Sequence, residues 1–150
     1  MRSRRLFYLA FPLLLLVLLG LACGGSSEPV TFSDLPVYSG ATAIRAGDNA
    51  FADLMAELMQ GAATSEEAST EVDIYTAPAG TTWNDVLAFY TDELNDTDWE
   101  SDTSLAQTSD AISMAGWTRG GGANEQALLV GHASDPLSGS PFIIVVLLSE

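Results

Sequence analysis

Seven consecutive apolar residues near the C-terminus, Phe142–Leu148, constrain the fold more than any other part of the sequence. Successive side chains of a β-strand point to opposite faces of its sheet. A strand that is apolar at every position therefore has to be buried on both faces. We expect 142–148 to be an internal strand of a sheet.

Three further segments have the patterns of strands. Residues 71–75 alternate polar and apolar side chains, which indicates a half-buried strand, and residues 111–118 and 126–133 are candidate strands. Gly120–Gly122 is placed to form the turn between these two, and residues 135–139 lead into the apolar strand. Since such connections are short, the strands should pair antiparallel.

A helix over residues 82–95 has the most local signals. Thr82 and Asp85 match the capping box, in which each side chain accepts a hydrogen bond from the other residue's backbone N–H. The apolar side chains that follow recur at helical spacing, so one broad face of the helix should pack on a sheet. These side chains are Trp83, Val86, Leu87, Phe89, Tyr90 and Leu94.

A second, shorter helix is expected over residues 49–60. Asp48 or Asn49 can cap its start, and Gly61 can end it. Its apolar stripe contains two methionines, which suit either a core or an adaptable binding surface. The elements together predict an α+β fold with one antiparallel sheet of about four to five strands, the helix 82–95 on one face and the shorter helix beside it.

The first residues of the chain have the pattern of a secretory signal. Three arginines precede an uncharged, leucine-rich run over residues 6–22, and small residues end the run. Leu19-Gly20-Leu21-Ala22-Cys23 resembles the bacterial lipobox, which implies cleavage before Cys23 and a diacylglyceryl group on its thiol. An uncleaved signal anchor is the alternative, because the run is at the lower length limit for a membrane helix.

The resemblance implies three parts of the chain. Residues 1–22 would be the signal peptide, residues 23–33 a lipidated cysteine with a flexible glycine- and serine-rich tether, and residues 34–150 one domain. Acyl chains on Cys23 would hold the domain on a membrane, since each buried CH₂ contributes about 0.8 kcal/mol. Cys23 is the only cysteine, so no disulfide forms within one chain.

The charge of the chain excludes several classes of partner. Residues 23–150 contain two arginines, no lysine and all 20 acidic residues, a net charge of −18. Nucleic-acid binding requires a basic surface, so we do not expect a nucleic-acid partner. In the simplest interpretation, this negative charge keeps the protein soluble or adapts it to a salty habitat. In a more specific interpretation, it attracts a cationic partner or binds a divalent metal.

An acidic cluster after the long helix is the candidate metal site. Its carboxylates alternate in sequence, so they would lie on one face, with Trp99 on the other, if the segment is extended. Ca²⁺ binds six to eight oxygen atoms, and it is the possible cofactor here, although the EF-hand pattern is absent. A solvated acidic edge is the alternative. Its candidate ligands are Asp96, Asp98, Glu100 and Asp102, and Asp92 and Glu93 precede them at the end of the helix.

Signals for catalysis are sparse. His132 is the only histidine, and no Gly-x-Ser-x-Gly elbow is present to expose a nucleophile. A hydrolase that depends on His132 stays a further alternative, because serines and acids are plentiful. We expect a chain that is not an enzyme, with no catalytic residues and no organic cofactor.

A second resemblance covers most of residues 34–148. Tyr38-Ser39-Gly40-Ala41, Tyr75, the helix around Phe89-Tyr90, and Trp99 resemble a small domain of uncharacterised bacterial lipoproteins. That pattern runs Tyr-Pro-Gly-Ala, strand, helix with Phe-Tyr, then Gly-Trp and a sheet. Ser39 and Asp98 replace its Pro and Gly. The resemblance implies a helix-and-sheet fold and no activity.

We therefore expect a lipid-anchored lipoprotein of the cell envelope whose domain faces the extracytoplasmic side. Its expected role is a non-enzymatic binding or assembly module. The expected partners are the membrane, through Cys23, and an envelope protein or a small ligand. The alternative is an envelope protein that binds Ca²⁺ through the acidic cluster of residues 92–102.

Overall fold

The computed structural model describes residues 28–61 and 68–150. The expected signal peptide and Cys23 lie outside these residues, so both stay predictions. None of the helices in the described ranges has the length and apolar character needed to cross a membrane. The elements in chain order are η1 Phe32–Asp34, β1 Thr42–Ala43, α2 Ala50–Gln60, β2 Ser69–Thr76, α3 Trp83–Leu94, β3 Glu100–Thr108, β4 Ile112–Arg119, η2 Gly122–Asn124, β5 Gln126–Ser134 and β6 Pro141–Ser149.

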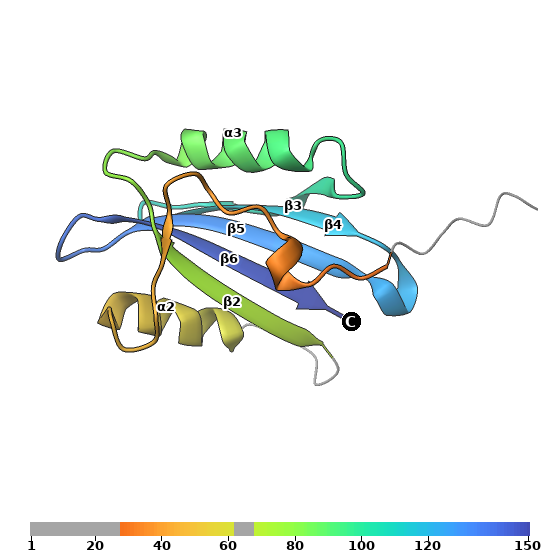
Figure 1. Cartoon of the computed structure of the whole chain (residues 1–150), viewed down its shortest axis with the longest axis horizontal. Helices are drawn as coiled ribbons and strands as arrows, with labels where there is room; N and C mark the ends of the chain where they lie inside the picture. The colour runs from red at the N-terminus through yellow and green to blue at the C-terminus, as the bar shows by residue number, and fades with distance from the viewer. Residues whose placement is uncertain (1–27, 62–67) are drawn as a thin grey trace, which may run out of the picture.

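The described strands form one antiparallel sheet in the order β1-β2-β6-β5-β4-β3 (Figure 1). The α+β class, the single antiparallel sheet and both helices are confirmed. Strand β6 lies between β2 and β5, and its residues 142–147 are buried, as its apolar sequence predicts. The hairpins β4–β5 and β5–β6 follow the glycine-containing connections expected for them.

The expected number of strands was wrong, because the sheet has six. The two additional strands are β1, which has two residues, and β3, which is rich in serine, threonine and acidic residues. Strand β3 is mostly exposed at one edge of the sheet, and because little of either face is buried its sequence does not alternate apolar and polar residues. Its pairing with β4 is what makes it a strand.

Helix α3 packs on one face of the sheet and begins as its sequence predicts. Thr82 and Asp85 form the capping box, with 2.8 Å between the Thr82 backbone nitrogen and an Asp85 carboxylate oxygen. Val86, Tyr90 and Leu94 are buried against β5, β6 and Trp117. The aromatic face of α3 therefore closes a core, as expected for a helix that covers a sheet.

The N-terminal segment 28–41 covers the same face of the sheet as α3 (Figure 1). Leu35 is buried in this core, and Tyr38 meets Phe89 edge-to-face with 5.2 Å between ring centroids. Residues 28–33 were expected to belong to a flexible tether. The structure instead packs Val30 and Phe32 of that stretch against the core, so the folded part begins earlier than residue 34.

Helix α2 lies across the opposite face of the sheet (Figure 1). Asn49 caps it by accepting hydrogen bonds from the backbone nitrogens of residues 51 and 52, and Gly61 follows its last turn. Phe51 stacks on Phe142 at 5.7 Å, and Met55 and Met59 pack against the second core. Its methionines are thus part of a core, whereas Leu54 and Leu58 are about half exposed.

The α2 face also contains a close contact between β3 and β4. Leu105 lies over Gly116, and a Cβ atom on Gly116 would collide with the Leu105 side chain. Gly131 on the neighbouring strand has more room, since the nearest atom to a Cβ there would be Met114 Cγ at 3.3 Å.

Gly116→Ala should lower the free energy of unfolding by about 1–3 kcal/mol in urea denaturation, because the added methyl overpacks the contact with Leu105. Gly131→Ala is the matched control and should have the smaller effect. Adding Leu105→Ala to Gly116→Ala should recover part of the loss. If the two glycine variants lose the same stability, the contact between Leu105 and Gly116 is not the cause.

Candidate functional site

The four carboxylates predicted as a Ca²⁺ site lie along the α3–β3 connection and the start of β3. Asp96 and Asp98 precede the strand, where a turn forms between Thr97 and Leu94, so the segment is extended only from Glu100 onward. Glu100 and Asp102 point to the α2 face of the sheet, while Trp99 is buried on the α3 face. Asp102 is already an acceptor for the Ser104 backbone nitrogen at 2.8 Å.

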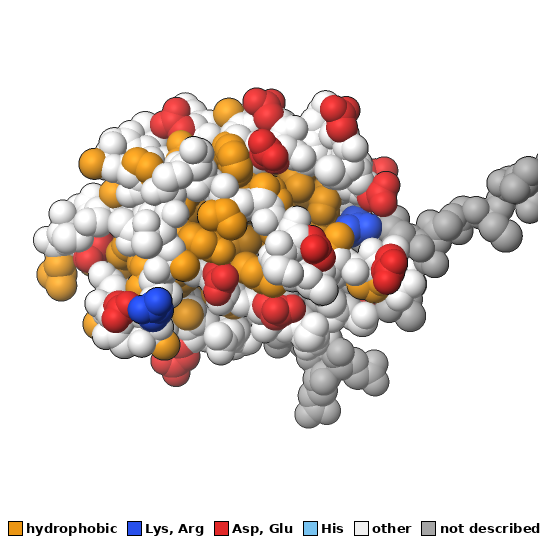
Figure 2. Space-filling view, in the orientation of Figure 1, with side chains coloured by type: hydrophobic (Ala, Val, Ile, Leu, Met, Phe, Trp, Pro, Cys, Tyr) orange, Lys and Arg blue, Asp and Glu red, His pale blue; other side chains and the backbone are white. Residues whose placement is uncertain are grey.

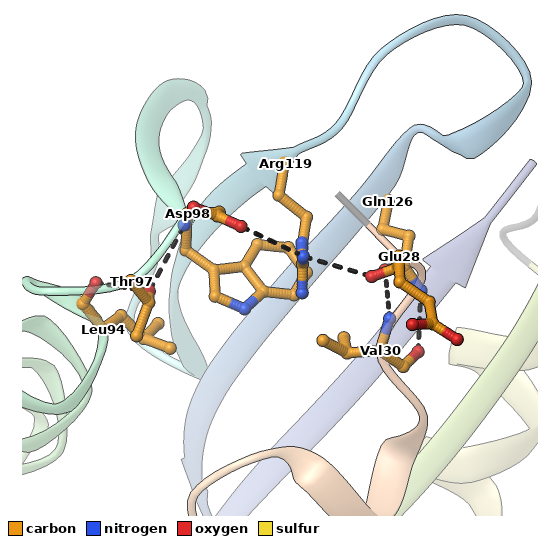
Figure 3. A network of polar contacts seen from close by, with 8 residues as sticks. Glu28, Val30, Leu94, Thr97, Asp98, Arg119 and Gln126 are labelled. Carbon is orange, nitrogen blue, oxygen red and sulfur yellow. Dashed lines mark hydrogen bonds and ion pairs between the residues drawn. The ribbon is translucent and has the colours of Figure 1, made fainter. Parts of the chain in front are cut away.

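Asp98 forms an ion pair with Arg119. Its carboxylate lies 3.4 Å from Nη2 of Arg119, whose side chain is only 8% exposed (Figure 3). Across residues 28–61 and 68–150, no three His, Cys, Asp or Glu side chains are arranged to hold a metal ion. The structure therefore does not bring the four carboxylates together around one point.

Arg119 is the centre of a network that the sequence did not predict. Its Nη2 also donates a hydrogen bond to the backbone oxygen of Glu28 at 3.2 Å, and its guanidinium lies over the ring of Trp99 at 5.5 Å (Figure 3). A guanidinium on an aromatic face is attracted by the ring quadrupole. The contacts join the start of the described chain to β4 and to the residue before β3. Arg119 is one of only two arginines after residue 22, and no lysine follows that residue. This rarity was the one signal in the sequence that could have pointed to a special role for Arg119.

Gln126 fastens the same N-terminal segment to the sheet. Its amide oxygen accepts from the Val30 nitrogen, its amide nitrogen donates to the Val30 oxygen, and both distances are 2.9 Å (Figure 3). The amide nitrogen also donates to Ser149 Oγ. Gln126 is 2% exposed, so these bonds satisfy an amide that would otherwise be buried without partners. Its position at the polar start of an apolar strand was the only hint in the sequence.

His132 lies near the other end of the sheet. It sits on β5 between Ser113 of β4 and Ile143 of β6, beneath the start of α3. Burial lowers the pKa of His132 below its ordinary value, while a hydrogen bond with the Thr81 backbone and the charge of Asp85 oppose this effect. Burial therefore favours the neutral form of the imidazole over the charged form.

A hollow of about 460 Å³ adjoins His132. The β3–β4 turn and the β5–β6 loop form its rim, and Phe51 closes it on the α2 side. Nε2 of His132 is buried and has no hydrogen-bond partner among the described residues. The pKa of the Asp85 carboxyl is lowered mainly by its hydrogen bonds with Thr82, and only to a smaller extent by the charge of His132. The described residues thus bring Ser113 and His132 side by side, but they assemble no relay from a carboxylate through His132 to a serine.

No protein-family model, no curated protein and no solved structure matches the chain. The site therefore has to be interpreted from its own geometry. Arg119 and Gln126 hold the first described residues at one end of the sheet, and the hollow beside His132 lies at the other end.

His132→Gln should reduce the dependence of stability on pH. In the wild type the unfolded chain takes up a proton near pH 6.5 that the folded chain resists, so the free energy of unfolding decreases as the pH falls below about 6.5. Urea denaturation at about pH 7 and about pH 5 should show this decrease in the wild type and a smaller one in the variant. An equal decrease in both proteins would mean that other groups cause it.

Proposed function

We propose that the chain is an exported, lipid-anchored protein whose domain is a non-enzymatic binding or assembly module on the extracytoplasmic side of a membrane. The sequence supports the anchor through the signal pattern and the resemblance of residues 19–23 to a lipobox.

The observation that carries the proposal is the attachment of residues 28–30 to one end of the sheet. Only residues 24–27 separate Cys23 from Glu28, whose backbone oxygen is bound by Arg119. A chain spans at most about 3.5 Å per residue, so the distance from Cys23 to Glu28 is at most about 18 Å. A lipid on Cys23 would hold that end of the domain close to the bilayer.

This attachment would also orient the domain. The first described residues lie at the same end of the sheet as the β4–β5 loop, while the β5–β6 loop and the start of α3 lie at the opposite end (Figure 1). The hollow beside His132 is at that opposite end and would face away from the lipid. The negative charge of the domain would repel an anionic bilayer within about 8 Å at physiological salt, which keeps its other surfaces accessible.

Cys23→Ala should abolish incorporation of radiolabelled palmitate when the full-length chain is expressed in a bacterial host, because the thiol is the only group that can take the diacylglyceryl unit. The wild type should be labelled and should run at the size expected for cleavage after residue 22. Labelled variant protein, or unlabelled wild type, would contradict the anchor.

Cross-linking in native membranes tests the module. The anchored wild type should give a discrete cross-linked species that Cys23→Ser does not give, because the anchor raises the local concentration of the domain at the membrane. His132→Gln is the control for an enzymatic role and should leave the cross-linked species unchanged. If no discrete species forms with the wild type at low or moderate salt, the assembly role is contradicted.

A further inference from the structure

Among the residues that the structure describes, none pairs with the outer edge of strand β2 over most of its length. The pairing with β1 covers only Tyr75 and Thr76, and one more bond joins the Ile44 nitrogen to the Ile74 oxygen. The chain then turns away between Arg45 and Asp48. No described residue pairs with the outer edge of β2 over residues 70–73.

The direction of the backbone groups on this edge follows from the neighbouring bonds. The Ile74 oxygen points outward to Ile44, and the Ala77 nitrogen points inward to Pro141 of β6. Backbone groups alternate in direction along a strand, so those of Val72 and Thr70 point outward as well. Two N–H and two C=O groups are therefore available in the geometry that an added strand requires.

Space for such a strand is present beside this edge. A hollow of about 530 Å³ is lined by β2 residues 70–73, by Thr31, Phe32 and Ser33 at η1, and by Gln60 at the end of α2. In Figure 1, η1 lies above β2 and the end of α2 lies below it, and both line the hollow. The edge is thus recessed between two elements that would limit which segment can enter.

The opposite edge of the sheet is protected in a way that β2 is not. The pairing of β3 with β4 shifts register between Asp102 and Gln107, and an irregular edge is a poor template for a further strand. The pairing of β2 with β6 has no shift across its whole length. Of the two edges, β2 is the regular one.

The charges beside β2 distinguish between two possible occupants of the edge, a second copy of this chain and a segment of another protein. Glu71 and Asp73 are exposed on the α3 face of the sheet, and Asp73 also accepts a hydrogen bond from the Tyr75 hydroxyl at 3.2 Å. In Figure 2 acidic side chains lie over the region where β2 and η1 run, with no Lys or Arg between them. A second copy paired antiparallel about Val72 would place Glu71 opposite Asp73, and like charges directly opposite are destabilising.

We propose that the free edge of β2 binds an extended segment of another protein as an added antiparallel strand, with basic side chains at alternate positions facing Glu71 and Asp73. The intervening side chains of the segment lie on the α2 face beside Val72, where apolar residues fit. The backbone groups of Thr70 and Val72 supply the affinity, and the two carboxylates supply the preference for a cationic partner. This inference names the partner of the proposed binding module, and it does not depend on the lipid.

The probe is a synthetic peptide of alternating lysine and valine, titrated at low salt into the full-length chain in neutral detergent and followed by fluorescence anisotropy. A peptide of the same sequence with methylated backbone nitrogens is the control for strand pairing. Hydrogen exchange should slow at residues 70–73 when the unmodified peptide binds, because the outward N–H groups become bonded.

Two variants separate the backbone from the charges. Val72→Pro removes an outward N–H and leaves the bonds to β6, since proline is tolerated on an edge strand, and it should weaken binding about tenfold. Glu71→Gln with Asp73→Asn should weaken binding about three- to tenfold. Glu100→Gln with Asp102→Asn removes the same charge from the other edge and should have less than a twofold effect, about the size of one screened surface charge.

The inference is overturned if the peptide does not bind, if the methylated peptide binds equally well, or if the charge variants of β2 and β3 have equal effects. Dimers of the chain alone that Val72→Pro dissociates in sedimentation would replace the proposed partner by a second copy. If the peptide fails while the wild type still gives a cross-linked species in membranes, the strand-addition inference fails and the proposed function stands.

Discussion

Burial of β6 on both of its faces is the constraint on which the rest of the structure depends. Ile143, Val145 and Leu147 belong to the core under α3, while Phe142, Ile144 and Val146 belong to the core over α2. A slip of one residue would exchange these two sets, so the register is strongly specified. Both faces also need a cover, and α3 with the N-terminal segment supplies one while α2 supplies the other.

The cover on the α3 face connects the fold to the proposed attachment. Residues 28–41 help close a core, so their path over the sheet is set by apolar burial, and Arg119 and Gln126 hold the point where that path begins. A segment with these contacts is not a simple spacer. A lipid on Cys23 would then orient the whole domain, with one end of the sheet toward the membrane and the hollow at His132 away from it, as proposed above.

Charge has different effects at different places on this surface. Asp98 forms an ion pair with Arg119. Hydrogen bonds from Ser104 lower the pKa of Asp102, and hydrogen bonds from the Leu137 backbone and the Ser138 side chain lower the pKa of Asp135, so these carboxylates serve local structure. Glu71 and Asp73 instead border a regular strand edge with unused backbone groups. An acidic surface that repels its own copies and attracts cationic strands is a physical basis for selective assembly.

The sequence alone determined the elements whose signals are local. The capping box at Thr82, the helical spacing of α3, the cap at Asn49 and the apolar run of β6 each act within a few residues, so their patterns sufficed. Only the tertiary structure decided the strand character of β3, the contacts of Arg119 and Gln126, and the free edge of β2. The contacts of Arg119 and Gln126 join residues that are far apart in the chain, as in the bond between Val30 and Gln126. A polar edge strand such as β3 and a buried amide such as Gln126 have no periodic pattern of their own. Their stability comes from partners that the fold brings together, which is why local patterns could not predict them.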